Sequence, residues 1–200
     1  MNYIKFVIIL ALLLTATACL SQPHPVKNHY TLGLSSPETA DRPQAARRTL
    51  LVGTVTAAAG FDNRSLVYKV GADRFESDFY NEYVAPPARL LADLTSQYLD
   101  QSSPRFRVVK TPGLTLAQYG LETYLEALYG DYTTGQPQAV VAIRFTLNDL
   151  RGSSPKVMWD KTYRHSASMA DKSPQALVEA QGLALNEILA ELNKDISRSR

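Results

Sequence analysis

Alternating apolar and polar positions predict β-strands along much of the chain. The clearest case is residues 139–147, where Val141, Ile143 and Phe145 would share one face and the polar residues between them the other. Similar alternation or short apolar runs predict further strands at residues 30–34, 50–56, 66–70, 105–110 and 157–164. The polar residues 149–155 are typical of a hairpin loop joining two of these strands.

Residues 116–129 fit two periodicities. Leu121, Leu125 and Leu128 recur at helical spacing, whereas Leu121, Thr123 and Leu125 alternate as on one face of a strand. The pattern fits both structures equally well, and we predict a strand here.

Two segments have the i, i+3/i+4 apolar spacing of amphipathic helices. The first begins at Pro86 and Pro87, since proline suits a first helical turn, and extends to about residue 101. The second begins at Ser173 and Pro174, where serine is a typical N-cap. Its apolar stripe consists of Leu177, Ala184, Leu185, Ile188, Leu189, Leu192 and Ile196.

The predicted order is strands, one helix, four strands and a final helix. Long hairpins pair neighbouring strands antiparallel, and amphipathic helices must bury their apolar stripes. We therefore predict an α+β fold, with a mostly antiparallel sheet and both helices packed on one face as a two-layer sandwich. Residues 30–200 would form this single domain, which is long enough to bury a core without disulfides.

The first 18 residues have the pattern of a signal peptide. Lys5 supplies a positive charge, residues 6–14 are an unbroken apolar run, and small residues precede Cys19. Spanning a bilayer takes about 20 apolar residues, so a permanent transmembrane helix is the weaker interpretation.

Cys19 is the one cysteine of the chain and stands where cleavage is expected. Exported proteins usually carry paired cysteines or none. A cysteine here can accept a diacylglyceryl group on its thiol and a third acyl chain on the freed amine. Each buried CH₂ contributes about 0.8 kcal/mol, so several chains give stable anchoring. We predict lipidation at Cys19, with residues 19–29 as the lipidated N-terminus and an extended, proline-containing tether.

The residues around Cys19 also resemble the lipobox of bacterial lipoproteins. Residues 16–19 read ATAC, which departs from the usual pattern at Ala16, where leucine is common. Leu20 rather than aspartate follows the cysteine. By resemblance to enteric sorting rules, this residue indicates the outer membrane, with the domain facing the periplasm.

Charge and motifs exclude several functions. Removal of residues 1–18 takes away only Lys5, which leaves 20 basic and 19 acidic residues, so no nucleic-acid partner is expected. The sequence has no glycine-rich phosphate loop, no Gly-x-Ser-x-Gly elbow and no metal-type cluster. We therefore expect no enzymatic activity, no cofactor and no metal.

The histidines offer only weak candidates for chemistry. His165, Ser166 and Asp171 could form a Ser/His/Asp set, but such sets arise by chance in any chain of this length. His24 and His29 fall in the predicted tether, where a solvated surface histidine is the simpler interpretation.

Tyrosine is unusually frequent, at 11 residues. These side chains either border the sheet and core with hydrated hydroxyls or form a partner-binding surface, and the first interpretation is the simpler. The same choice arises within residues 73–84, where acidic and aromatic side chains are interleaved and a solvated face is expected. The residues concerned are Asp73, Phe75, Glu76, Asp78, Phe79, Tyr80, Glu82 and Tyr83.

Several segments covering most of the predicted domain carry a family resemblance. They are residues 30–32, 61–71 (FDNRSLVYKVG), 78–91 (DFYNEYVAPPARLL), 106–109 (FRVV), 124–132 (YLEALYGDY) and 139–149 (AVVAIRFTLND), followed by the closing helix. Together they resemble the ABC-type transport auxiliary lipoprotein family, which accompanies Mce-type intermembrane lipid transport systems, including the paraquat-inducible one. Some relatives carry tryptophan near the place of Tyr83.

The resemblance implies a non-enzymatic accessory subunit that docks a transport assembly at the membrane. The implied partners are the ABC permease and ATPase and an Mce-domain protein, with homo-oligomers as a further expectation. The family supplies one functional residue to carry over, the acylated cysteine, here Cys19. Two alternatives stay open, a lipid-binding or envelope-assembly lipoprotein and a lipid-anchored hydrolase that uses Ser166 and His165.

Replacing the predicted acylation site tests the anchor. In Cys19→Ala, the thiol that would accept the lipid is missing, so we expect the protein in the soluble periplasmic fraction or as an unprocessed precursor. Fractionation, with mass analysis of the N-terminal peptide of the unaltered protein, checks this. A native N-terminus without acyl groups would contradict the prediction.

Overall fold

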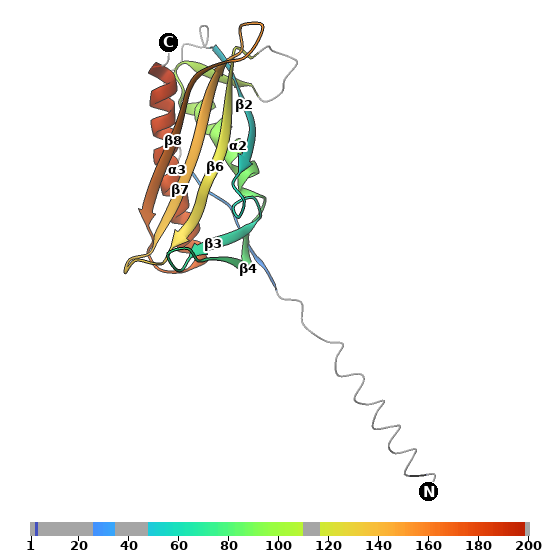
Figure 1. Cartoon of the computed structure of the whole chain (residues 1–200), viewed down its shortest axis with the longest axis vertical. Coiled ribbons are helices and arrows are strands. Elements are labelled where there is room, and N and C mark those ends of the chain that lie inside the picture. Colours follow the sequence, from blue (N-terminus) through green and yellow to red (C-terminus); the bar gives the residue numbers. More distant parts are fainter. Residues whose placement is uncertain (1–2, 4–25, 35–47, 110–116, 199–200) are drawn as a thin grey trace.

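Eight strands and two helices make up the described part of the chain (Figure 1). In the computed structural model, the described residues are 3, 26–34, 48–109 and 117–198. The strands are β1 (Asn28–Tyr30), β2 (Arg48–Ala57), β3 (Ser65–Lys69), β4 (Phe75–Tyr83), β5 (Phe106–Val109), β6 (Tyr119–Asp131), β7 (Gln138–Asp149) and β8 (Lys156–Ser168). The helices are α2 (Pro87–Ser102) and α3 (Pro174–Arg198).

Strand β6 is the centre of the sheet. Along one edge it pairs antiparallel with β7, which in turn pairs with β8. Its other edge is shared, because its first half pairs with β2 and its last two residues pair with β3. The sheet therefore divides into two branches beyond β6, one formed by β2 and β5 and the other by β3, β4 and β1.

The prediction of a mostly antiparallel sheet is wrong. Among the described strands, four of the seven pairings are parallel: β1 with β4, and β2 with β5, β2 with β6, and β3 with β6. Parallel neighbours need a crossover connection, and β3, β4 and α2 together form the one between β2 and β5. Alternation identifies a strand but not its partner, because parallel and antiparallel strands share the same period of two.

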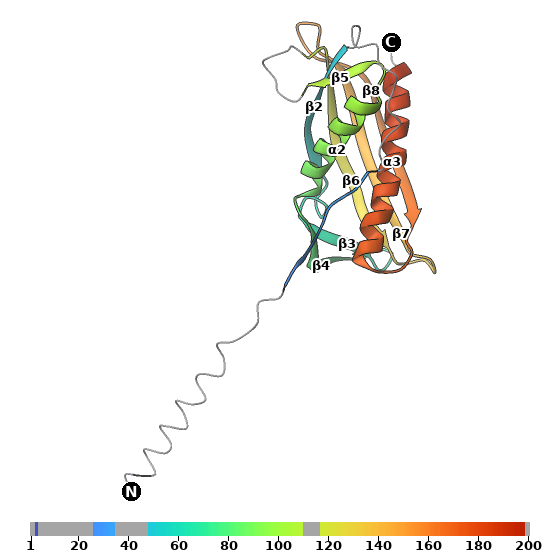
Figure 2. The ribbon, with the colours of Figure 1, turned by 180° about the vertical axis from the view of Figure 1, so that it is seen from behind.

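Both helices lie on one face of the sheet, as predicted (Figure 2). Helix α2 packs on β2 and β5, and α3 packs on β7 and β8. The seven residues of the predicted apolar stripe of α3 are each at most 2% exposed. The predicted helix start is also confirmed, because the Ser173 Oγ accepts a hydrogen bond from the Ala176 N–H at 3.2 Å.

Residues 119–131 form a strand, so the ambiguous segment has the predicted conformation. Leu121 and Leu125 are fully buried beneath the helices, whereas Tyr124 is 41% exposed on the open face of the sheet. A bulge between Leu125 and Ala127 shifts this alternation. Beyond the bulge, Ala127 belongs to a small apolar cluster separate from the main core.

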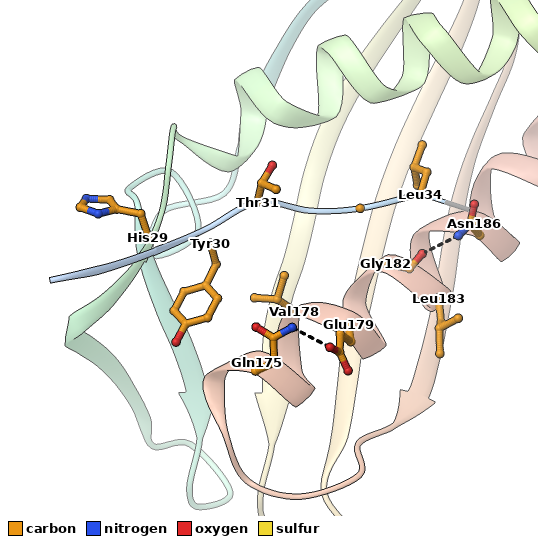
Figure 3. A pocket seen from close by; sticks show the side chains of 11 residues that line it. His29, Tyr30, Thr31, Leu34, Gln175, Val178, Glu179, Gly182, Leu183 and Asn186 are labelled. Carbon is orange, nitrogen blue, oxygen red and sulfur yellow. Dashed lines mark hydrogen bonds between the residues drawn. The ribbon is translucent and has the colours of Figure 1, made fainter. Parts of the chain in front are cut away.

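Residues 31–34, here called the N-terminal strap, follow β1 and cross the helical side of the molecule (Figure 3). Leu32 is 3% exposed and joins the main core. At the crossing, the Gly33 carbonyl lies so close to α3 that a Cβ atom on Gly182 would overlap its oxygen. Glycine at position 182 is therefore required for the strap to lie against the helix.

Adding one methyl group at this crossing tests its importance. A helical Gly→Ala change ordinarily stabilises by about 1 kcal/mol, but overlap with backbone costs about 1–3 kcal/mol. We expect Gly182→Ala to lower the free energy of unfolding, measured by urea denaturation. Gly135→Ala, where the new Cβ would meet nothing within 4 Å, should change it by less than about 0.5 kcal/mol. A higher free energy of unfolding in Gly182→Ala would contradict this prediction, because it would show that the strap moves away from α3 at little cost.

Candidate functional site

The N-terminal segment joins the folded body at the edge of the sheet. Strand β1 pairs parallel with the end of β4, with Asn28 opposite Asn81 and Tyr30 opposite Tyr83. We call Lys27, β1 and residues 78–83 of β4 the tether junction, because the chain from Cys19 would enter the body here. Cys19 itself lies outside the described residues.

One carboxylate connects the incoming chain to the body. Glu82 accepts three basic groups, with its oxygens 3.3 Å from Lys27 Nζ, 3.0 Å from His29 Nε2 and 2.8 Å from Arg64 Nη2. Its side chain is 13% exposed. Desolvation opposes ionisation, but the hydrogen bond from Lys27 and the charges of Arg64 and Lys27 outweigh it, so the pKa of Glu82 is lowered. The carboxylate therefore stays charged and holds residues 27–29 against the sheet.

Strand β4 makes a wide bulge at the same place. Between the pairs Ser65↔Glu82 and Val67↔Ser77, β3 advances two residues while β4 advances five. The extra residues of β4 leave the plane of pairing and project outward.

Asp78 holds this bulge in shape. Its carboxylate accepts hydrogen bonds from the Tyr68 hydroxyl (2.8 Å), the Tyr80 N–H (2.8 Å), and the N–H and side-chain amide of Asn81 (3.0 and 2.9 Å). Desolvation opposes ionisation, but these hydrogen bonds outweigh it and lower the pKa of Asp78. Asp78 and Glu82 are therefore bonded parts of the fold and not members of the predicted solvated acidic face.

Two aromatic rings project from the bulge into solvent. Phe79 is 59% and Tyr80 55% exposed, and their ring centres are 5.2 Å apart. The Lys27 ammonium lies 4.9 Å from the centre of the Phe79 ring. We call Phe79 and Tyr80 the aromatic tip. The tip differs from the five tyrosines packed into the core, which are Tyr83, Tyr98, Tyr119, Tyr129 and Tyr163.

A cavity of about 650 Å³ is lined by β1, the N-terminal strap and the first half of α3 (Figure 3). Three of its polar side chains have partners within α3: Gln175 Nε2 donates to Glu179 Oε1 at 2.6 Å, and Asn186 Nδ2 donates to the Gly182 carbonyl at 3.1 Å. The lining residues are His29, Tyr30, Thr31, Gly33, Leu34, Gln175, Val178, Glu179, Gly182, Leu183 and Asn186. The cavity is suited to contact with another molecule and brings together no reactive set.

A second hollow, of about 440 Å³, lies on the open face of the sheet. Its charges are internally satisfied, since Arg144 Nε donates to both Asp160 oxygens at 2.7 and 2.9 Å and Thr146 Oγ1 donates at 2.6 Å. The hydrogen bonds from Arg144 and Thr146 lower the pKa of Asp160. Asp160 is therefore held as a structural ion pair in the hollow, and Glu122, which also lines it, accepts a hydrogen bond from Asn148 Nδ2 at 2.9 Å.

The weak catalytic candidates are not brought together. His165 Nε2 lies 2.9 Å from Glu191 Oε1, and the Asp171 carboxylate instead accepts the Ser173 N–H at 2.7 Å. Ser166 follows His165 on β8, so the two side chains project to opposite faces. Among the described residues, no group of three His, Cys, Asp or Glu side chains is placed to hold a metal ion.

The structure describes one of the two N-terminal histidines. His29 belongs to β1 and not to the tether, and its side chain, 46% exposed at the surface as expected, lies 3.0 Å from Glu82. His24 lies outside the described residues. Within the described ranges, no helix is both long and apolar enough to cross a bilayer.

Sequence reasoning missed the tether junction. The Asp78–Asn81 bulge has a local signal, since aspartate and asparagine three residues apart favour side-chain turns. The three partners of Glu82 have none, because they come from segments 18 to 55 residues away along the chain.

Comparison with known proteins identifies one matching family. The model of a family described as "ABC-type transport auxiliary lipoprotein component" matches residues 30–193. No curated protein sequence matches the chain.

Solved structures share the fold at low sequence identity. Protein XCC0632 from Xanthomonas campestris is 16% identical, with a TM-score of 0.74 over 86% of this chain and 95% of its own. An uncharacterized protein is 18% identical, with a TM-score of 0.66 over 86% and 99%. The hypothetical protein CT253 from Chlamydia trachomatis is 12% identical, with a TM-score of 0.58 over 77% and 98%. At these identities the similarity concerns the fold alone.

Removing the charge of Glu82 tests the junction. In Glu82→Gln, three basic groups lose their anionic acceptor, so we expect faster amide hydrogen exchange at residues 27–30. Glu76→Gln is the matched control, because Glu76 lies on the same strand, is 58% exposed and pairs with Arg74 alone among the described ion pairs. Equal protection of β1 in both variants would contradict the role given to Glu82.

The same residue predicts a pH dependence. A carboxyl whose pKa is lowered by folding stabilises the folded state above its ordinary pKa, and this contribution is lost as pH falls through the lowered value. Protection factors at residues 27–30 should therefore fall in acid below pH 4.5, the ordinary value for Glu82. In Glu82→Gln this component of the pH dependence should be absent. An identical acid profile in both proteins would assign it to other carboxylates.

Proposed function

Since the chain belongs to the family of ABC-type transport auxiliary lipoprotein components, we propose that it is a non-enzymatic docking subunit of an Mce-type lipid transport system. Acyl chains on Cys19 would hold it in the cell envelope, at the outer membrane and facing the periplasm. The match over residues 30–193 carries the proposal, because it spans the folded body of the chain.

The tether junction supports the anchoring part of the proposal. Eight residue steps separate Cys19 from Lys27, which gives a reach of at most about 28 Å. The body is thus confined near the lipid anchor. Its point of attachment to the tether is fixed by the pairing of β1 with β4 and by Glu82. A docking protein needs such a defined attachment, whereas a freely diffusing carrier does not.

The surface of the body supports the docking part. The cavity beside the N-terminal strap and the aromatic tip are exposed features suited to contact, and Gln175 and Asn186 in the cavity lining are engaged in hydrogen bonds within α3. The expected partners are the permease and ATPase of the transporter, its Mce-domain protein and further copies of this chain.

The alternative of lipid carriage between the sheet and the helices gains no support from the packing. The space between these layers is filled by apolar side chains that are at most 1% exposed, including Leu121, Leu125, Ile143, Leu185 and Ile188. An acyl chain would have to displace these contacts, and tightly packed cores resist such insertion.

Recovery of partners from membranes tests the docking role. The full-length protein with a C-terminal affinity tag, cross-linked in cells and purified in detergent, should recover the permease and the Mce-domain protein. Cys19→Ala is the matched control and should recover much less of both, because it loses its place at the membrane. If the acylated protein recovers neither component, the docking role is wrong.

A further inference from the structure

The aromatic tip protrudes from β4 on a bulge whose shape is fixed by hydrogen bonds. Residues 78–81 of β4 have no partner on β3, and Phe79 and Tyr80 among them are exposed to solvent. The four hydrogen bonds to Asp78 fix the shape of the bulge. Aromatic side chains with an apolar body and a polar tip, such as Tyr80, are enriched at interfaces where one end is apolar and the other hydrated.

The tip is also linked to the incoming chain. Asn81, within the bulge, accepts hydrogen bonds on Oδ1 from the side-chain amide of Asn28 (3.0 Å) and from the Tyr30 hydroxyl (3.3 Å). Lys27 covers the Phe79 ring from the same side. Cys19 is therefore at most about 28 Å of chain from Lys27, the residue whose ammonium lies against the Phe79 ring.

The three carboxylates of β4 each have a bonded partner among the described residues, so none of them faces a phospholipid surface as a lone negative charge. Lys27 and Arg64 lie against Glu82, and His29 adds a positive charge there only when it is protonated. The Asp78 carboxylate is occupied by hydrogen bonds, and Glu76 is paired with Arg74 at 3.5 Å. Lipid phosphates would thus meet basic groups and paired carboxylates. Two exposed aliphatic side chains flank the junction: Val26 is 84% and Val84 49% exposed.

We propose that the aromatic tip lies in the headgroup region of the bilayer that holds the Cys19 lipid. This rests on the proposed anchoring function and adds a second contact to it. Aromatic side chains favour the membrane interface, with tyrosine keeping its hydroxyl hydrated, and lysine stems extend toward the headgroups.

The second contact determines the orientation of the folded body relative to the membrane. Acyl chains attached through the N-terminal residues limit the distance of the body from the lipid, whereas a contact of the body itself at the tip also fixes its orientation. The end of the sheet that carries β3, β4 and the β6–β7 turn would face the lipid (Figure 1). The β7–β8 hairpin and the end of α3 lie at the opposite end and would point away from the membrane (Figures 1 and 2).

Fluorescence quenching by lipids tests the contact directly. The full-length acylated protein is reconstituted into vesicles of phosphatidylcholine and phosphatidylglycerol, with or without phospholipids that carry a nitroxide high on the acyl chain. Tyr80→Trp should show blue-shifted emission and lose intensity to the nitroxide. Tyr124→Trp, exposed by 41% on the open face, is the matched control and should keep its intensity. The native Trp159, half-buried on β8, provides the baseline in the unaltered protein.

The outcomes separate this inference from the anchoring it rests on. If the proteins float with the vesicles but the tryptophan at position 80 is not quenched, the tip faces solvent or a protein and the inference is overturned while anchoring stands. If the unaltered protein does not float, the anchoring fails and the inference with it. Phe79→Trp is a second probe of the same tip, should the change at Tyr80 disturb the bulge.

Discussion

A protein anchored through its N-terminus has a defined position only if the segment that enters the folded body is fixed to it. Strand β1 has three residues, too few to remain in place through pairing alone. Three further contacts hold it: the Glu82 carboxylate, the burial of Leu32 and the close crossing of Gly33 with Gly182. These involve different elements, β4 and α3, so the strap also joins the sheet edge to the helical layer.

The strands and helices could be predicted because each has one buried face. The alternation in β7 and the apolar stripe of α3 both reflect a side that meets the core, and both predictions were correct. Strand order could not be predicted, since β2 and β3 share one edge of β6 and nothing in either sequence specifies a neighbour. Strand β1 was placed about two residues too late, because its pairing partner lies 53 residues away.

The candidate site shows the same division between local and distant signals. Cys19 was identified from its local pattern, and its acylation remains a prediction because the residue lies outside the described part of the chain. Strand alternation separates His165 from Ser166 in β8, but the predicted strand ended at residue 164, so the sequence prediction could not reject that pair. The junction around Glu82 required tertiary structure, because it gathers Lys27, His29 and Arg64 from separate segments.

The dimensions of the body bear on what a docking subunit can do. Strand β6 has 13 residues and spans about 43 Å at about 3.3 Å per residue. Helix α3 has 25 residues and spans about 37 Å beside it. Continuous pairing of β6, β7 and β8 with α3 packed across them makes this length rigid. A partner bound at the end opposite the tether junction would be held at a fixed distance from the lipid. A flexible linker of the same length would leave that distance variable.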